Sequence, residues 1–335
     1  MKLIALLIGL VIERLASQFF HWRRMRWLDR IIDSGFKQAQ RVANWPPLIP
    51  VLLLAGLLVL PVFAVIFILG STLAGFTYLL LAVVVLFFSL GPKDIGEEVD
   101  EYCKALESED EETIHNAAKA IVEGEVPTDA RERVSRVEES ICVQANNHLF
   151  AVVFWFIFFG PLGAWAYRVT DLIRRRAVFN ASRDEETQND VTQHEESEQT
   201  EDTVLEGETD SIETRDDKIN GNALAVRDAA VMLHGWLAWI PARLTAVGYA
   251  AAGHFDEAIA AMRAPTEQRD ATTSEHSENL LARVGTAALA LEDKADETIT
   301  ERGVRGAVAA NGLVFRQLII WAVIISAMTL YGFTR

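Results

Sequence analysis

The chain has 335 residues, half of them hydrophobic, and its 47 acidic residues outnumber its 31 basic residues to give a net charge of −16. This excess of acid argues against a nucleic-acid-binding protein, whose affinity comes from neutralising phosphates with lysine and arginine. The two cysteines, Cys103 and Cys142, are too few for a disulfide framework or a closed zinc site, so reduced thiols are expected.

The first 20 residues contain a short apolar run. Residues 3–12 are apolar, and Glu13 and Arg14 then interrupt the pattern. The length suits a signal peptide, but no small-residue cleavage site follows. We therefore expect a retained, membrane-associated helix over residues 1–20, and the sequence leaves open whether it crosses the membrane.

A long apolar stretch at residues 48–90 carries no charged side chain. About 20 apolar residues are needed to cross a bilayer as a helix, so two transmembrane helices fit here. Gly70 and Ser71 mark the expected turn, which gives spans near 48–69 and 72–90. Pro61 is expected to kink the first span without ending it.

Two further spans are predicted, at residues 149–169 and 314–333. The first of these precedes Arg174, Arg175 and Arg176, which can anchor its end among lipid headgroups. Orientation signals conflict, because the basic residues between positions 21 and 45 and this arginine triplet both favour the cytoplasmic side, whereas four alternating spans would separate them. A re-entrant apolar segment is one alternative, and the topology stays open.

Water-soluble helices are predicted between the second and third spans. Two of them have apolar residues at helical spacing, one over residues 97–107 and one over 111–123, and a third begins near residue 129. The residues expected to face a common core are Val99, Tyr102, Leu106, Ile114, Ala118 and Ile121. This pattern is typical of a small helical module with an acidic surface.

Residues 182–222 are crowded with acidic and amide side chains and are almost free of aliphatic ones. Such a segment buries too little apolar surface to offset the entropy of ordering it, so a disordered acidic linker is predicted. Residues 223–252 are apolar but interrupted by charges and by Pro241, which favours an interfacial or bundle-packed helix that ends or bends at the proline. Another helix is predicted over residues 278–292.

The sequence thus predicts an all-α, polytopic membrane helix bundle with helical extramembrane segments. Its successive parts are a membrane-associated helix (1–20), a basic amphipathic segment (21–47), two transmembrane helices (48–90), an acidic helical region (91–147), a transmembrane helix (148–169), a basic juxtamembrane segment (170–181), the acidic linker (182–222), amphipathic or interfacial helices (223–313) and a C-terminal transmembrane helix (314–335).

Charged and amide side chains recur in or beside the apolar segments. Each has a simple interpretation as a helix cap, an intrahelical ion pair or a snorkelling anchor. Such groups are nevertheless costly in a membrane and usually turn inward, so a shared polar pocket is the alternative. The residues expected to line it are Glu13, Asn147, Tyr167, Arg168 and Arg243, with the arginines holding an anionic group.

Known catalytic signatures are absent from the sequence. There is no phosphate-binding glycine loop, no nucleophile elbow and no histidine or cysteine cluster with metal-ligand spacing. We therefore assign no catalytic residue, metal or cofactor, and the pattern favours a non-catalytic role. The expected partners are membrane lipid, a small anionic ligand and a protein signalling partner, and no nucleic acid.

Two stretches carry a family resemblance. Residues 159–168, with the sequence FGPLGAWAYR, and residues 239–246, with the sequence WIPARLTA, resemble signature segments of the AmpE family, and the early Glu13-Arg-Leu and His21-Trp22 elements are also similar. The resemblance implies a bacterial inner-membrane protein with an accessory or sensory role in β-lactamase induction. It covers nearly the whole chain except the acidic linker, which looks like an insertion.

AmpE proteins in turn resemble the cobalamin-biosynthesis protein CobD/CbiB, an amide-forming membrane enzyme. The shared parts are the Gly160–Arg168 turn and the Pro-Ala-Arg-Leu stretch beginning at Pro241. Against this activity, Val169 and Thr170 stand where the enzyme family has an Asn-Thr pair. A ligase of this kind is the alternative function, and a scaffold that recruits a basic partner through the acidic linker is a third.

Overall fold

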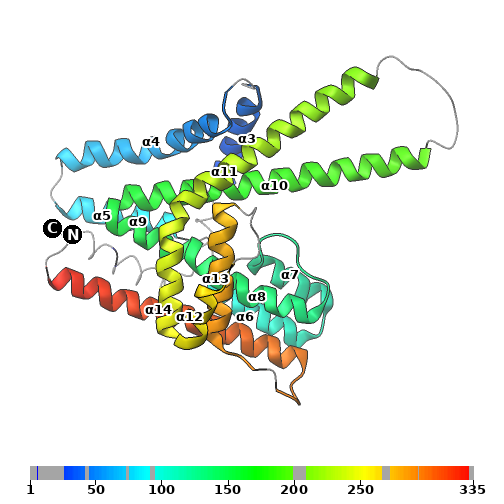
Figure 1. Ribbon diagram of the computed structural model, residues 1–335. Helices are drawn as coiled ribbons and strands as arrows, with labels where there is room; N and C mark the ends of the chain where they lie inside the picture. The colour runs from blue at the N-terminus through cyan, green and yellow to red at the C-terminus, as the bar shows by residue number, and fades with distance from the viewer. Residues whose placement is uncertain are drawn as a thin grey trace. The chain divides into compact units, whose positions relative to one another are not determined.

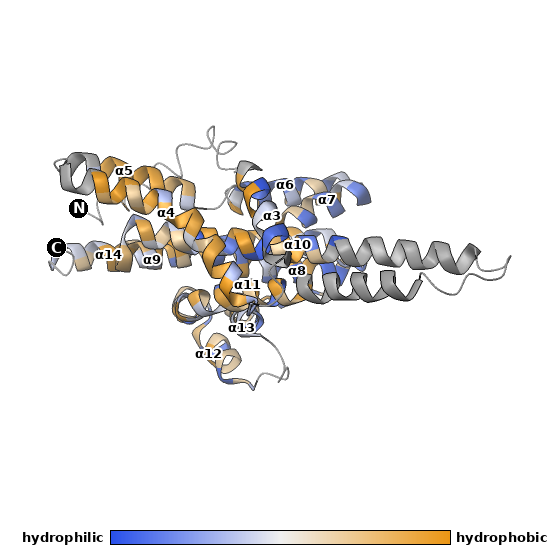
Figure 2. Cartoon of the chain, turned by 90° about the horizontal axis from the view of Figure 1, so that it is seen from above, coloured by the Kyte–Doolittle hydropathy of each residue, from blue (hydrophilic) through white to orange (hydrophobic). Residues whose placement is uncertain are grey.

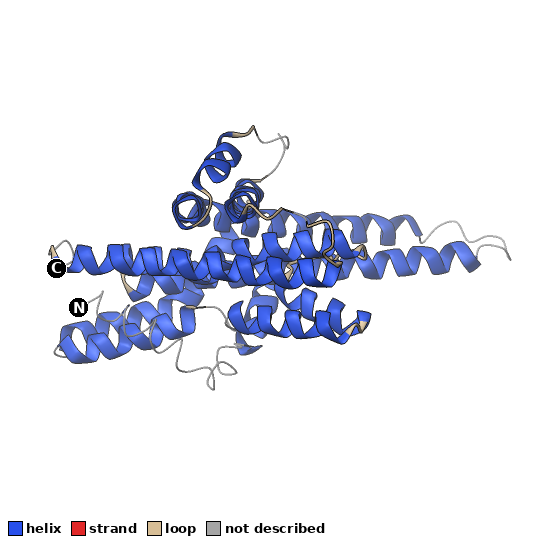
Figure 3. Ribbon diagram, turned by 90° about the horizontal axis from the view of Figure 1, so that it is seen from below, coloured by secondary structure: helices blue, strands red, loops and turns tan. Residues whose placement is uncertain are grey.

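The computed structural model describes Leu6 and residues 26–41, 45–72, 75–90, 95–198, 209–265, 272–292 and 294–331. Every regular element in these ranges is a helix, which confirms the predicted all-α fold (Figures 1 and 3). In chain order the helices are α3 (Arg26–Arg41), α4 (Leu48–Thr72), α5 (Gly75–Ser89), α6 (Ile95–Ser108), α7 (Glu111–Ile121), α8 (Ala130–Ala145), the π-helix η2 (Asn146–Phe150), α9 (Ala151–Phe159), α10 (Pro161–Glu198), α11 (Thr209–Ala252), α12 (Phe255–Arg263), α13 (Thr273–Leu289) and α14 (Ile299–Leu330).

The chain divides into two compact units. The first unit takes its described residues from 1–24, 62–168 and 235–335, and the second from 25–61 and 169–234. Helices α4, α10 and α11 each contribute residues to both units.

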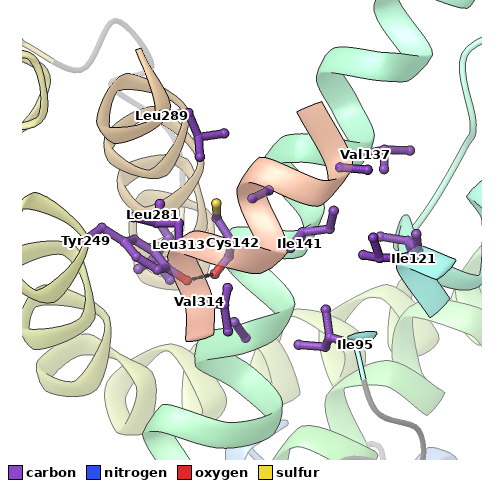
Figure 4. Close-up of a cluster of buried hydrophobic side chains, with 14 of the residues drawn as sticks. Ile95, Ile121, Val137, Ile141, Cys142, Tyr249, Leu281, Leu289, Leu313 and Val314 are labelled. Carbon is purple, nitrogen blue, oxygen red and sulfur yellow. Dashed lines mark hydrogen bonds between the residues drawn. The ribbon is translucent and has the colours of Figure 1, made fainter. Parts of the chain in front are cut away.

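The larger core of the first unit lies among α6, α7, α8, α11, α13 and α14 (Figure 4). Val99, Tyr102 and Leu106 of α6 are buried there, as are the apolar residues predicted for α7, which confirms both predicted helix faces. The Tyr249 hydroxyl of α11 donates a hydrogen bond of 2.7 Å to the carbonyl oxygen of Cys142 on α8. Aliphatic burial therefore binds helices that are far apart in the sequence into one body.

Four of the described helices in this body, α7, α8, α13 and α14, begin with a side-chain cap. Asp110 accepts the backbone N–H of Thr113 at the start of α7, and Asp129 accepts that of Glu132 at the start of α8. Helices α13 and α14 each begin with a capping box. These caps pair backbone donors that a helix start would otherwise leave free, so the boundaries are encoded locally.

Among the residues that the structure describes, three helical stretches are long and apolar enough to cross a membrane. They are Leu48–Ile68, Ala130–Phe159 and Ile299–Thr329, and Tyr78–Ser89 is a shorter apolar helix. In Figure 2 hydrophobic residues, drawn in orange, are prominent along α4, α5 and α9 and recur along α14. A second apolar cluster in the first unit joins α5, α9, the start of α10, α11 and α14.

The apolar segment predicted as one span at residues 149–169 is divided in the structure. Helix α9 ends at Phe159 and α10 begins at Pro161, with Gly160 between them at a φ of 68°. Glycine adopts this left-handed conformation without the steric cost that a side chain would impose. The chain therefore turns in the middle of the predicted span.

The described helices also enter the acidic segment at residues 182–222. Helix α10 continues to Glu198 and α11 begins at Thr209, whereas residues 199–208 lie outside the described ranges. Helix α11 continues through Pro241 to Ala252, so the proline does not end it.

Candidate functional site

A buried layer of polar side chains crosses the first unit. It consists of Asn146 and Asn147 of η2, Tyr167 of α10, Thr245 of α11 and Gln317 of α14, and we call these five residues the polar layer. Each is at most 1% exposed. A buried polar group is costly without a hydrogen-bond partner. Polar groups that pair within the layer therefore hold the four helices in one arrangement, and any that stay unpaired indicate a place for a bound polar molecule.

Hydrogen bonds connect the layer from helix to helix. The Thr245 hydroxyl donates to Asn146 Oδ1 over 3.0 Å, and Asn146 Nδ2 donates to Asn147 Oδ1 over 3.1 Å. The same Asn147 oxygen faces the Tyr167 hydroxyl at 3.5 Å, and Gln317 Nε2 donates to the Thr245 carbonyl oxygen over 3.2 Å.

The two asparagines lie in a π-helical turn. The N–H of Ala151 bonds the carbonyl oxygen of Asn146, five residues earlier, in place of the α-helical partner four residues earlier. Such turns are rare and recur at functional sites, because the extra residue re-aims the side chains around it. Here both asparagine amides reach the interior of the bundle.

Two atoms of the layer have no hydrogen-bond partner in the described structure. Asn147 Nδ2 and Gln317 Oε1 are buried and unsatisfied. Buried unsatisfied polar atoms are uncommon in folded proteins and call for a specific explanation. A donor and an acceptor of this kind suit a small polar group placed between the helices.

A glycine allows Gln317 to occupy its place. A Cβ atom added to Gly248 of α11 would lie 2.8 Å from Gln317 Cδ. Helices α11 and α14 therefore approach closely at the polar layer, and only glycine fits there without moving the amide.

The structure brings together two of the five predicted ligand-binding residues, Asn147 and Tyr167, in the polar layer. Arg168, the next residue of α10, is 2% exposed. Arg243 lies on an exposed face of α11, and Glu13 lies outside the described residues. Ligand binding by the five residues stays a prediction.

The exposed face of α11 has a distinct character. The Arg243 guanidinium lies 3.8 Å from the centre of the Trp239 ring and donates to the Trp239 carbonyl oxygen over 3.0 Å. Large apolar side chains surround it on the same helix, namely Trp236, Ile240, Leu244 and Val247. A stacked arginine among exposed aromatic residues is typical of a membrane interface.

A separate ion cluster lies in the second unit. The buried carboxylate of Asp171 accepts hydrogen bonds from Arg174 Nη2 at 3.2 Å and from Arg175 Nε at 3.0 Å. His234 Nε2 of α11 lies 3.8 Å from the same carboxylate. Buried charges require such paired surroundings, so this cluster fixes α10 against α11.

The second unit also joins α3 to α10 through one carboxylate. Arg176 contacts both oxygens of Asp33, with Nε at 2.7 Å and Nη2 at 2.5 Å, and Asn180 Nδ2 donates to Asp33 over 3.1 Å. The hydrogen bond from Arg176 is the main reason that the pKa of Asp33 is lowered. Sequence separation of more than 140 residues makes this contact informative about the path of the chain.

Two cavities lie elsewhere in the first unit. One of about 230 Å³ is bordered by Arg131, Ser135, Lys294, Thr298 and Arg302, and a smaller one of about 110 Å³ is bordered by Glu123, Glu139 and Glu278. Neither is lined by a predicted site residue. Within the described ranges, no three His, Cys, Asp or Glu side chains are grouped as metal ligands would be.

The predicted site omitted three members of the polar layer, Asn146, Thr245 and Gln317. Thr245 belongs to the recognised stretch at residues 239–246, and Gln317 is an amide within an apolar helix, which is a usable signal. Thr245 contacts Asn146, 99 residues away in the chain, and Gln317 contacts Thr245, 72 residues away. Helical periodicity does not reveal contacts between residues so far apart.

These features define an all-helical protein with helices suited to a membrane and a polar layer at their junction with a helical module. The family model described as "Regulatory signalling modulator protein AmpE" matches residues 1–195 and 222–334, and the chain belongs to this family. The internal gap in the match, residues 196–221, lies within the acidic segment interpreted above as an insertion. Neither the curated proteins nor the solved structures contain a match, so the similarity to CobD/CbiB is not confirmed.

Proposed function

We propose that this protein resides in the bacterial inner membrane as a multi-pass accessory or sensory component that modulates β-lactamase induction in response to β-lactam or cell-wall stress. Membership of the AmpE family, whose description is a regulatory signalling modulator, is the observation that carries this proposal. Three helical stretches long and apolar enough to cross a membrane support the location.

The polar layer supports a ligand-sensing mechanism. Its unsatisfied atoms, Asn147 Nδ2 and Gln317 Oε1, belong to η2 and α14, which also contribute to the core of the helical module. A small ligand that offered an acceptor to Asn147 Nδ2 and a hydrogen-bond donor to Gln317 Oε1 would favour one arrangement of these helices over another. In this mechanism Arg168 supplies charge for an anionic group, as its guanidinium suits carboxylate or phosphate.

The direct test is genetic. Deletion of the gene from a strain with an inducible β-lactamase is expected to change β-lactamase activity after exposure to a β-lactam, and the wild-type gene is expected to restore it. A complementing Asn147→Leu variant, present in membranes at the wild-type level, should fail to restore the response. An unchanged induction curve in the deletion strain contradicts the regulatory role.

A matched variant tests the ligand mechanism separately. Gly56 of α4 has no atom within 4 Å of the position of an added Cβ, so Gly56→Ala should restore induction fully. If Asn147→Leu also restores induction fully, the regulatory role stands and the polar layer has no part in sensing.

A further inference from the structure

The turn at Gly160 reverses the direction of the chain within its apolar segment. Asn147 precedes Gly160 by 13 residues and Tyr167 follows it by seven. A continuous helix would separate the two by about 30 Å, at 1.5 Å per residue. The Tyr167 hydroxyl instead lies 3.5 Å from Asn147 Oδ1, so η2, α9 and the first turns of α10 form a helical hairpin.

The stretch Ala130–Phe159 is long and apolar enough to cross a membrane by length and overall hydropathy, but Gln144, Asn146, Asn147 and His148 interrupt it. Its uninterrupted apolar part, which forms the arm of the hairpin, is too short to cross a bilayer. Between the polar residue His148 and Gly160 there are 11 apolar residues, 149–159. They extend about 16 Å as a helix, roughly half of a hydrocarbon core of about 30 Å. Helix α4, by contrast, offers 21 apolar residues from Leu48 to Ile68.

The tip of the hairpin exposes aromatic side chains. Phe158 and Phe159 are 63% and 64% exposed. Each packs against an aromatic neighbour one turn earlier, since Phe154 and Phe158 have ring centres 4.7 Å apart and Trp155 and Phe159 have theirs 5.6 Å apart. The indole N–H of Trp155 donates to the Leu237 carbonyl oxygen over 3.1 Å, so the exposed rings of Phe158 and Phe159 present only apolar surface, which suits the acyl region of a lipid leaflet.

The contact between Asp33 and Arg176 fixes the parity of the membrane crossings between these two residues. Charged side chains joined at 2.5 Å lie on one side of a membrane, so the chain between them crosses it an even number of times. Between the two residues, α4 is long enough to cross the membrane. We assign the second crossing to the uncharged residues 72–90, within which the structure describes the shorter apolar helix α5. The hairpin then adds no crossing. The basic segments at residues 21–47 and 170–181 lie on one side of the membrane, as is expected when positively charged segments remain on the cytoplasmic side.

We propose that residues 146–168 form a re-entrant hairpin that enters the lipid bilayer and returns to the side from which it entered, with the Phe158 and Phe159 side chains among the acyl chains of one leaflet. This proposal rests on the membrane location proposed above and is independent of any role in β-lactamase induction.

Cysteine labelling tests the proposal in the full-length protein. The parent is Cys103→Ser, which keeps the fully buried Cys142. Single cysteines replace the exposed residues Glu125 before the hairpin, Arg183 after it and Tyr331 at the end of α14. A membrane-impermeant maleimide is then applied to sealed vesicles of each orientation.

Glu125→Cys and Arg183→Cys should react in vesicles of the same orientation, and Tyr331→Cys in the opposite one. Reaction of the first two in opposite orientations would show a single crossing and overturn the proposal. A Phe159→Cys variant should react in neither orientation until detergent is added. Its reaction from either aqueous side of sealed vesicles would place the tip outside the lipid and also overturn it.

Failure of the membrane location has a different signature. In that case alkaline carbonate would extract the protein, and all the exposed cysteines would react in both vesicle preparations. β-Lactamase induction is not measured in this experiment, so its outcome does not depend on the regulatory role.

Discussion

Glu138 of α8 and Arg302 of α14 form a two-point ion pair inside the first unit. Arg302 Nη1 contacts Glu138 Oε1, and Nη2 lies 3.4 Å from Oε2. The carboxylate side chain is only 6% exposed and that of the arginine is 22% exposed. Both helices continue into apolar stretches. The ion pair fixes the register of α8 against α14 at a point in each helix that precedes the polar layer in the chain.

Removal of the arginine should destabilise the protein strongly. Arg302→Ala leaves a buried carboxylate without this partner, and we expect a loss of about 3 kcal/mol in the free energy of unfolding, the lower end of the range for a broken buried pair. Thermal unfolding of the detergent-solubilised protein, followed by circular dichroism, measures it. The control is Arg136→Ala, whose pair with Glu139 is partly exposed and should cost less than about 1 kcal/mol. Equal effects of the two variants would contradict the assignment.

Gly306 of α14 is required by the same pair. A Cβ atom added there would overlap Glu138 Oε1 and lie 2.6 Å from Arg302 Nη1. Gly306→Ala should therefore destabilise by about 1–3 kcal/mol, as overpacking of a well-filled interior does. Gly312→Ala on the same helix meets only Arg316 Nη1 at 3.6 Å and should leave the melting temperature unchanged or raise it. If Gly306→Ala and Gly312→Ala have the same melting temperature, the close approach of α8 and α14 at Gly306 does not affect stability.

The Tyr102 hydroxyl in the core of the helical module is buried and has no hydrogen-bond partner in the described structure. Burial also raises the pKa of Tyr102 to about 12. Tyr102→Phe removes an unsatisfied group and should be neutral or stabilising by about 1 kcal/mol. Tyr249→Phe is the matched control, because it deletes the hydrogen bond to Cys142 and should cost about 1 kcal/mol. A lower melting temperature for Tyr102→Phe than for Tyr249→Phe would refute this reading of the core.

Acid should weaken the contact between α3 and α10. Hydrogen bonding to Arg176 lowers the pKa of Asp33 below its ordinary value, so the folded form binds this proton less readily than the unfolded form. The resulting stabilisation is fully present above the ordinary carboxyl pKa of about 4 and is lost as pH falls through the lower folded value.

Melting temperatures of wild type and Asp33→Asn, measured between pH 6 and pH 3 (a range chosen about the carboxyl pKa), test this dependence. The two should differ most near neutral pH and converge in acid, since the partly exposed pair is screened and modest in strength. Parallel curves over the whole range would show that Asp33 does not contribute through its charge.

Local patterns predicted the helical module well. The spacing of Val99, Tyr102 and Leu106 identified the buried face of α6, because amphipathic periodicity depends only on neighbouring residues. The break at Gly160 was not predicted, although a Gly-Pro pair is a turn signal, because the apolar residues on both sides satisfied the pattern of a continuous span.

The candidate site was predictable only in part. Asn147 and Tyr167 were expected to share a pocket and do lie together in the polar layer. Arg243 was grouped with them because of its charge. Helix α11 has apolar residues on every face, so its sequence does not show which face is buried. That depends on which helices pack against it. Those neighbours, η2, α8 and α14, contact α11 through residues between 72 and 107 positions away in the chain.

The π-helical turn at residues 146–150 contains one residue more than an α-helix would need. Deletion of a single residue within it would restore regular winding and rotate every later position of α9 by about 100° relative to α8. The aromatic tip would then point in a new direction while the module below it kept its packing. The orientation of that tip is therefore set by one surplus amino acid, which a single in-frame codon deletion would remove.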